Sequence, residues 1–234
     1  MLNEQIIRLE KMVGKEAIDK LLGSKIIVFG LGGVGSYTVT ALARSGVLEL
    51  GIVDMDTIEL SNINRQLFAL HSTIGKLKTE VCKDRINDIN PTCNVDTYAF
   101  RYSADTMDKI DLSKYDYIVD AIDMVSSKIL LIEQAQKLDI PIISCMGTGN
   151  KMNPSMLEVA DIYDTSVCPL AKEIRKQLRA KGIEKLKVVY SKETPIVRGK
   201  VIASFIAVPA TAGLILASEV LKDITYKERE YGKN

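Results

Sequence analysis

The chain has 234 residues, with 31 Lys and Arg against 30 Asp and Glu, so its formal net charge is +1. This length suits one large domain with a sizeable core, and the balanced charge does not indicate that the chain as a whole binds nucleic acid. The four cysteines include no C-x-x-C pair, which argues against a zinc site of the usual spacing and against a disulfide scaffold.

Two segments of the chain bear on membrane insertion or export. The start of the chain, MLNEQIIRLEKMVGK, contains acids and no apolar run, so no signal peptide is expected and the protein is predicted to be cytoplasmic. Residues 201–218 carry no charge and approach the length of a membrane-spanning helix. Pro209 divides them, and the pattern favours a buried strand, VIASFIAV, followed by a core helix that begins at the proline. We therefore expect no stable membrane insertion.

Helix and strand patterns alternate from the first residues onward. Apolar residues at helical spacing over 5–22 precede a short β-rich run at 25–29. Further strands are predicted at residues 48–53, 95–100, 117–121 and 140–145, with helices ending at 44, 89 and 138 between them. This alternation predicts an α/β, Rossmann-like fold with a mainly parallel sheet and helices on both faces.

The pattern changes after Gly147. Residues 147–155, GTGNKMNPS, form a loop rich in turn residues. Strands at 157–163 and 187–190 flank a helix at 170–181, and a final strand and helix close the chain as a C-terminal extension. We expect a single domain over 1–234, with a nucleotide-binding core at 5–150 and a substrate-facing extension at 151–225.

The stretch VFGLGGVGSY places Gly30, Gly32 and Gly35 in the pattern G-x-G-x-x-G, between a predicted strand and a predicted helix. Such a turn lets phosphate oxygens approach backbone N–H groups at a helix N-terminus. Asp54 follows the next strand, where a carboxylate can accept hydrogen bonds from ribose hydroxyls. The glycines could also serve only a tight turn. As a nucleotide site, the motif fits NAD and ATP equally well.

A second cluster of polar residues favours ATP. Asn62, Arg65, Gln66 and Lys78 lie in the run after Asp54, and Asp123 follows the predicted strand at 117–121. Arginine and lysine can meet the charge that develops on a triphosphate, and a carboxylate can hold Mg²⁺. Singly, the cations could be solvated and Asp123 could cap the next helix. Together they indicate attack at a phosphate.

The run DMDTIELSNINRQ resembles the signature of the ubiquitin-activating-enzyme-like adenylyltransferases, a superfamily that includes the activators of the molybdopterin and thiamine sulfur carriers. The resemblance implies that a substrate carboxylate attacks the α-phosphate of ATP, in the presence of Mg²⁺, to form an acyl-adenylate. It also implies a homodimer in which an N-terminal arginine reaches the partner's site, with Arg8 as the candidate, although Arg8 could equally be a surface residue.

The resemblance assigns roles residue by residue. Asp54 would hold ribose, Asn62 and Arg65 would contact phosphates, Lys78 would stabilise the transition state and Asp123 would coordinate Mg²⁺. The catalytic residues implied are Arg65, Lys78 and Asp123. The ATP-binding residues implied are Gly30, Gly32, Gly33, Gly35, Asp54, Asp56, Asn62, Arg65, Gln66, Lys78 and Arg8.

Within this superfamily the sulfur-carrier activators typically have two C-x-x-C pairs, which this chain lacks. Stretches such as ARSGVLELGIVDMD, GTGNKMNPS and VADIYDTSVCPLAKEIRKQLRAKGI instead resemble the subgroup of tRNA threonylcarbamoyladenosine dehydratases. That resemblance implies activation of the threonyl carboxylate on a modified adenosine beside the anticodon, and ring closure with net loss of water. Adenylation of a ubiquitin-like sulfur carrier is the alternative, followed by an NAD-dependent oxidoreductase and a non-catalytic RNA-binding or partner-binding relative.

Residues 170–187 concentrate positive charge, with seven basic residues against two acidic ones. Lys172, Arg175, Lys176 and Arg179 recur on one helical face. A basic face on a mildly acidic body is typical of contacts with a nucleic-acid backbone, although a solvated helix face would look the same. We expect tRNA at this face.

Three points stay open at this stage. Cys168 could lie near the active site or could be an apolar filler. The sequence also leaves open whether a monovalent cation binds and whether a cysteine desulfurase or sulfur acceptor acts as a partner.

Overall fold

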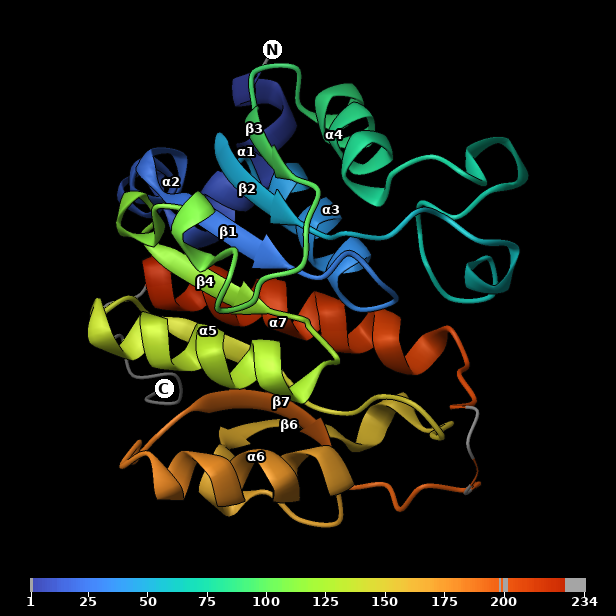
Figure 1. Ribbon diagram of the computed structural model, residues 1–234. Helices are drawn as coiled ribbons and strands as arrows, with labels where there is room; N and C mark the ends of the chain where they lie inside the picture. Colours follow the sequence, from blue (N-terminus) through green and yellow to red (C-terminus); the bar gives the residue numbers. More distant parts are fainter. Residues whose placement is uncertain (1, 198, 200–201, 226–234) are drawn as a thin grey trace.

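The computed structural model describes residues 2–197, 199 and 202–225. Its centre is one seven-stranded sheet in the order β3-β2-β1-β4-β5-β7-β6 (Figure 1). All neighbouring strands are parallel except the pair β6 and β7, which is antiparallel. The strands are β1 (Lys25–Phe29), β2 (Glu49–Val53), β3 (Asn94–Tyr98), β4 (Tyr117–Asp120), β5 (Ile142–Cys145), β6 (Leu157–Asp161) and β7 (Lys187–Ser191). The prediction of an α/β, Rossmann-like and mainly parallel fold is confirmed.

Helices cover both faces of the sheet, because its central strands are apolar on both sides. One face packs against α2 (Lys15–Gly23), α3 (Gly35–Arg44), α4 (Lys78–Ile89) and α7 (Ala207–Thr225). The opposite face packs against α5 (Val125–Lys137), α6 (Pro169–Ala180) and the segment between β3 and β4. Helix α1 (Leu2–Val13) packs beside α2.

Two glycines allow backbones to approach more closely than any side chain would permit. A Cβ atom on Gly35 would lie 1.8 Å from the carbonyl oxygen of Gly30, where the turn after β1 enters α3. A Cβ atom on Gly213 would lie 2.3 Å from the carbonyl oxygen of Val34, where α7 crosses the start of α3. The glycine turn therefore packs closely against the start of α3 and against α7.

The sequence predictions were wrong at two elements. The single helix expected over 5–22 is two helices, because Gly14 adopts a φ of 87° that interrupts helical geometry. The buried strand expected at 201–208 is absent. Val201 lies outside the described residues, residues 202–206 form no strand, and the Ile202 side chain is 71% exposed. The uncharged run had suggested burial, but β6 already occupies the sheet edge beside β7.

The C-terminal helix is attached to the sheet by a charged network at its last turns. Lys187 of β7 lies 2.7 Å from a carboxylate oxygen of Glu219 and 2.8 Å from one of Asp223. The Tyr117 hydroxyl donates to the Asp223 carboxylate at 2.6 Å, and Lys222 lies 2.7 Å from Glu219. Burial alone would raise the pKa of Glu219, but hydrogen bonds from the two lysines lower it below its ordinary value of 4.5. No helix in the described part of the chain is long and apolar enough to cross a membrane.

Candidate nucleotide and acyl-substrate site

A cavity of about 700 Å³ lies at the carboxyl ends of the parallel strands. It is lined by the glycine turn, by parts of residues 53–66, by the segments that follow β3, β4 and β5, and by the start of α6. Strands β1 and β4 are neighbours although they are far apart in sequence, and such a switch point is where open α/β sheets bind ligands. Most of the nucleotide-site residues predicted from the sequence therefore line one cavity, whereas Gly35, Arg8 and the four basic residues of α6 do not.

The glycine turn shows which glycines serve the fold and which leave space. Gly30 has a φ of 87°, and a Cβ there would lie 2.6 Å from the carbonyl oxygen of Ala121. At Gly32 a Cβ would meet only the Gln66 side chain, at 3.9 Å. At Gly33 it would lie 3.2 Å from Pro209. The protein itself therefore does not require glycine at position 32, and the open space faces the cavity, as a phosphate site needs.

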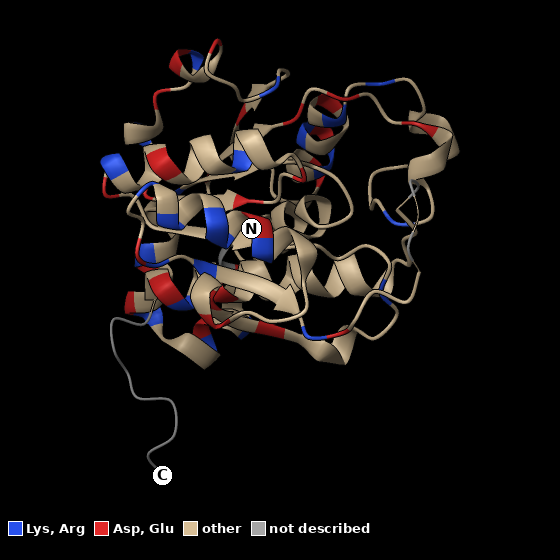
Figure 2. Cartoon of the chain, turned by 60° about the horizontal axis from the view of Figure 1, so that its bottom comes forward, with Lys and Arg blue, Asp and Glu red and all other residues tan. Residues whose placement is uncertain are grey.

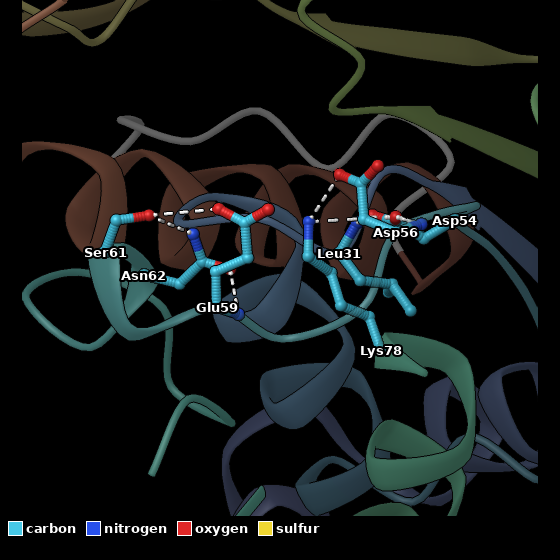
Figure 3. Close-up of polar contacts among 7 residues, drawn as sticks. All are labelled: Leu31, Asp54, Asp56, Glu59, Ser61, Asn62 and Lys78. Atoms are coloured by element: carbon cyan, nitrogen blue, oxygen red, sulfur yellow. Dashed lines mark hydrogen bonds and ion pairs between the residues drawn. The ribbon is translucent and has the colours of Figure 1, made fainter. Parts of the chain in front are cut away.

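Asp54, at the end of β2, is held by two backbone amides (Figure 3). Its two carboxylate oxygens accept from the N–H of Leu31 at 2.7 Å and from the N–H of Asp56 at 2.9 Å. Burial raises the pKa of Asp54, and the positive charge of Lys78 counteracts part of that effect. The carboxylate is thus fixed beside the glycine turn, with lone pairs left to accept hydrogen bonds from ribose hydroxyls.

Lys78 begins α4 and is buried in the cavity wall. Its ammonium lies 2.7 Å from the Asp56 carboxylate and 3.8 Å from that of Asp54. Its backbone N–H also donates to the carbonyl oxygen of Asp56 at 3.0 Å. The cation is therefore held at the cavity by acidic neighbours, and the sequence had not indicated that Asp56 contacts Lys78.

Asn62 and Arg65 are positioned by a short turn after β2. The Asn62 side chain accepts from the N–H of Glu59 at 3.1 Å and donates to the Ser61 hydroxyl at 3.3 Å (Figure 3). One guanidinium nitrogen of Arg65 donates to the carbonyl oxygen of Ser61 at 2.8 Å and to the Asn64 side chain at 3.0 Å. The other guanidinium N–H groups make no hydrogen bond with the described residues, and Arg65 lines the cavity.

Asp123 lies in the loop between β4 and α5, where it is exposed and lines the cavity. The described residues contain no group of three or more His, Cys, Asp or Glu side chains that could hold a metal by themselves. A lone carboxylate fits Mg²⁺, because this ion commonly takes one or two carboxylates and completes its shell with phosphates and water. The donor set therefore suits a metal that arrives with a nucleotide.

Beneath this loop lies a buried ion pair that the sequence analysis missed. Asp120 and Lys128 are both fully buried, with 2.7 Å between the carboxylate and the ammonium. Asp120 also accepts from the Ser144 hydroxyl at 2.7 Å and from the N–H of Ile122 at 3.1 Å, and Lys128 donates to the carbonyl oxygen of Cys145 at 3.0 Å. The pair thus joins the ends of β4 and β5. Helical spacing could have indicated that Lys128 is buried, because it lies on the same face of α5 as buried apolar residues.

The cavity's second wall comes from the loop at residues 147–153. Lys151 is only 3% exposed, and its ammonium donates to the carbonyl oxygens of Gly147 at 2.9 Å and Ser191 at 3.3 Å. Glu193 accepts from the N–H groups of Met152 and Asn153. Burial lowers the pKa of Lys151. No sequence pattern predicts these contacts, because they join a loop to the end of β7 and the residues after it.

Cys168 also lines this wall, where it is buried immediately before α6. The prediction that it could lie near the site agrees with this position. All four cysteines are buried as free thiols.

The basic face of α6 is only partly free. Lys172, Lys176 and Arg179 are exposed, whereas Arg175 is half-buried and donates to the carbonyl oxygen and hydroxyl of Thr165. Arg179 lies over the ring of Tyr163, at 5.2 Å from its centroid. Figure 2, which brings the lower side of Figure 1 forward, shows basic and acidic segments interspersed along the helices. Arg8 is exposed on α1 and does not line the cavity of its own chain.

The strand order, the glycine turn and the acid after β2 define a Rossmann-type nucleotide-binding protein. Comparisons with known proteins identify the family within this class. The chain belongs to the ThiF family, whose model matches residues 2–234. The predicted superfamily is therefore confirmed over almost the whole chain.

The relatives most similar in sequence include tRNA threonylcarbamoyladenosine dehydratases. The chain is 40% identical to that of Bacillus subtilis (strain 168), covering 94% of both chains. It is 42% identical to that of Haemophilus influenzae over 70% of its own length, and it spans 63% of that relative. Among solved structures, E. coli tRNA N6-threonylcarbamoyladenosine dehydratase in complex with ATP matches with a TM-score of 0.90 at 31% identity, covering 95% of this chain and 94% of the other.

Proposed function

We propose that this protein is an ATP-dependent tRNA dehydratase that cyclises threonylcarbamoyladenosine beside the anticodon. The observation that carries the proposal is the single cavity that joins Asp54, Arg65, Lys78 and Asp123 to a separate wall at residues 145–151. The similarity to dehydratases over 94% of both chains supports the same activity. The ATP complex of the E. coli relative, at a TM-score of 0.90, supports ATP as the nucleotide.

In the proposed reaction a carboxylate oxygen of the threonyl group attacks the α-phosphorus of ATP. The bond from that phosphorus to the bridging oxygen breaks, and pyrophosphate leaves. A second group of the same side chain then attacks the acyl carbon, loses its proton and releases AMP, which closes the ring. The substrate loses the elements of one water, and these appear in AMP and pyrophosphate together.

We assign the nucleotide half of the cavity as follows. Asp54 accepts hydrogen bonds from ribose hydroxyls, and the backbone N–H groups at Gly32 donate to phosphate oxygens. Arg65 and Lys78 meet the charge that grows on the α-phosphate and the leaving group, which is where preorganised cations accelerate a reaction most. Asp123 is the residue that would hold Mg²⁺, and this ion would neutralise phosphate charge. The binding residues in this proposal are Gly30, Gly32, Gly33, Gly35, Asp54, Asp56, Asn62, Arg65, Gln66 and Lys78.

The domain division and the partners are further parts of the proposal. Residues 5–150 would hold ATP and residues 151–225 would face tRNA, with the exposed lysines of α6 contacting its backbone. A homodimer would cover the apolar side chains that are exposed at residues 196–197, 202 and 205–206. In this homodimer Arg8 of one subunit would reach the site of the other. A sulfur-transfer partner is the weaker candidate, because no cysteine thiol is exposed. A tRNA substrate implies work in the cytoplasm.

The test is to incubate the protein with ATP, Mg²⁺ and tRNA that carries threonylcarbamoyladenosine. Nucleoside mass spectrometry should show loss of one water from the modified adenosine, with AMP and pyrophosphate formed in step. Unmodified tRNA should give neither product. Pyrophosphate exchange that depends on a carrier protein ending in Gly-Gly, with no change in the nucleoside, would contradict the proposal and favour sulfur-carrier adenylation.

A further inference from the structure

Buried lysines in the described part of the chain differ in how their charge is compensated. Three are buried, namely Lys78, Lys128 and Lys151. The first two each have a carboxylate oxygen at 2.7 Å. Around Lys151 no carboxylate of the described residues lies within the 4.0 Å that defines an ion pair. Among the described residues its ammonium has two carbonyl oxygens as hydrogen-bond partners, which leaves one N–H without a partner and the charge without a carboxylate in contact.

An ammonium buried without an anion is costly, so proteins normally pair such a charge. Besides burial, which lowers the pKa of Lys151, and the buried thiols of Cys168 and Cys145, the carboxylate that acts on this pKa is that of Glu193. That carboxylate is occupied by the N–H groups of Met152 and Asn153, at 2.8 to 3.1 Å. The fold therefore places the Lys151 ammonium on the cavity wall, while the Glu193 carboxylate is hydrogen-bonded to backbone N–H groups.

The residues that line the cavity indicate which kind of ligand the Lys151 ammonium would bind. In its nucleotide half the lining includes Asp54, Asp56, Glu59 and Asp123 besides its cations. In the other half, which is lined by residues 145–151, 168–170, 195, 202 and 204, Lys151 is the single charged residue among those described. A neutral wall with one cation suits an organic anion, and it gives no reason for a second metal or an amine to bind there.

The backbone beside Lys151 is tied to another segment by hydrogen bonds. Asn150, which precedes it, has a φ of 60° and exchanges hydrogen bonds with the backbone of Ala203 at 2.7 Å in both directions. The N–H of Ile196 donates to the carbonyl oxygen of Asn150 at 2.8 Å. The stretch between β7 and α7, distant in sequence, thus holds the loop that carries the lysine, as a preorganised recognition group requires.

We propose that Lys151 is the cation that receives the substrate carboxylate and thereby selects the threonylcarbamoyl-modified adenosine over an unmodified one. The inference rests on the proposed dehydratase function and extends it to the acyl half of the cavity. The carboxylate takes the remaining N–H of the ammonium and compensates its charge. One carboxylate oxygen is then directed at the α-phosphate, on the side of Arg65 and Lys78.

The experiment compares two tRNAs that differ only at the carboxylate. One carries threonylcarbamoyladenosine, and the other carries the methyl ester of the same threonyl group, which has no charge. Binding of each tRNA is measured with a non-hydrolysable ATP analogue present, for wild type, Lys151→Met, Lys151→Gln and Lys151→Arg. Lys137→Met, at the exposed end of α5 and outside the cavity lining, is the matched control, and the affinity for the ATP analogue reports whether each variant is folded.

Wild type should bind the free carboxylate at least about tenfold more tightly than the ester, as a charge-assisted hydrogen bond implies. Lys151→Met should bind both tRNAs equally and retain its affinity for the ATP analogue. Lys151→Gln keeps N–H donors without the charge and should lie between the two. Lys151→Arg should keep most of the discrimination, and Lys137→Met should behave as wild type.

Two outcomes would overturn the inference separately. If wild type dehydrates the modified tRNA and folded Lys151→Met or Lys151→Gln still discriminates as wild type does, the dehydratase function stands and the role of Lys151 is wrong. If wild type does not convert the modified tRNA at all, the proposed function and the inference fall together. Should the methionine variant not fold, the glutamine and arginine variants decide the matter.

Discussion

The buried pair of Asp120 and Lys128 allows a sharp prediction, because both side chains are fully buried and each reaches a different strand end. Lys128→Met removes the ammonium at nearly constant side-chain length and leaves the Asp120 carboxylate without a cation. Breaking a buried pair in this way costs about 3–5 kcal/mol. The Ser144 hydroxyl and the Ile122 N–H remain bound to the carboxylate, so we expect a loss near the lower limit, about 3 kcal/mol.

For a domain of this size about 3 kcal/mol corresponds to a fall in Tm of roughly 6–12 °C. Urea unfolding gives the free energy directly, and calorimetry gives the Tm. Lys172→Met, an exposed lysine on α6, is the control and should change stability by no more than about 0.5 kcal/mol. The double variant Asp120→Asn/Lys128→Met leaves no charge at this buried pair and should recover most of the loss.

The same reasoning predicts a separation of stability from activity. A neutral pair can be as stable as a buried ion pair, but a methionine cannot donate to the carbonyl oxygen of Cys145. The double variant should therefore turn over more slowly than its stability would suggest, because the loop at residues 147–153 and the loop with Asp123 lose their common anchor. A stability loss below about 1 kcal/mol in Lys128→Met, or a double variant no more stable than the single one, would refute the argument.

Three further predictions address the site and α7. Gly35→Ala should prevent stable folding, whereas Gly32→Ala should keep the wild-type Tm and bind ATP more weakly by calorimetry. Its ATP affinity would stay unchanged if phosphate does not approach that backbone. Arg65→Ala and Lys78→Ala should each cost about 3 kcal/mol in kcat/KM, and near-normal turnover would refute their roles. Glu219→Gln should lower the Tm above pH 4.5, the ordinary pKa of this carboxyl. Since the folded-state pKa is depressed, the difference should vanish as the pH falls through it, and a constant difference would contradict the network.

Much of the fold was predictable because strand and helix periodicities differ and because parallel strands end at one edge. Asp54 and Asp123 follow separate strands in the sequence, and both line the same cavity. The two errors have different causes. The helix break comes from the φ of 87° at Gly14, whereas the run at 202–206 adds no strand because β6 already occupies the sheet edge beside β7.

The contacts of individual side chains were less predictable. Arg175 belongs to a basic stripe in sequence, yet its guanidinium is turned toward Thr165. The pairing of Lys78 with Asp56 and that of Lys128 with Asp120 depend on which backbone segments the sheet brings together. Sequence spacing gives the side of an element on which a charge lies, whereas its partner is determined by tertiary packing.

The three buried lysines connect the fold to the proposed chemistry. Lys78 is matched by acids at the nucleotide half, and Lys128 is matched beneath the floor of the cavity. Only Lys151, on the acyl side, is held by carbonyl oxygens without a carboxylate in contact, within the part of the chain that the structure describes. A structural cation and a cation that awaits a substrate differ in this respect, because the second gains its anion only on binding. The cost of burying Lys151 uncompensated in the free protein is thus returned when the substrate carboxylate arrives, which converts a destabilising feature of the fold into selectivity for that substrate.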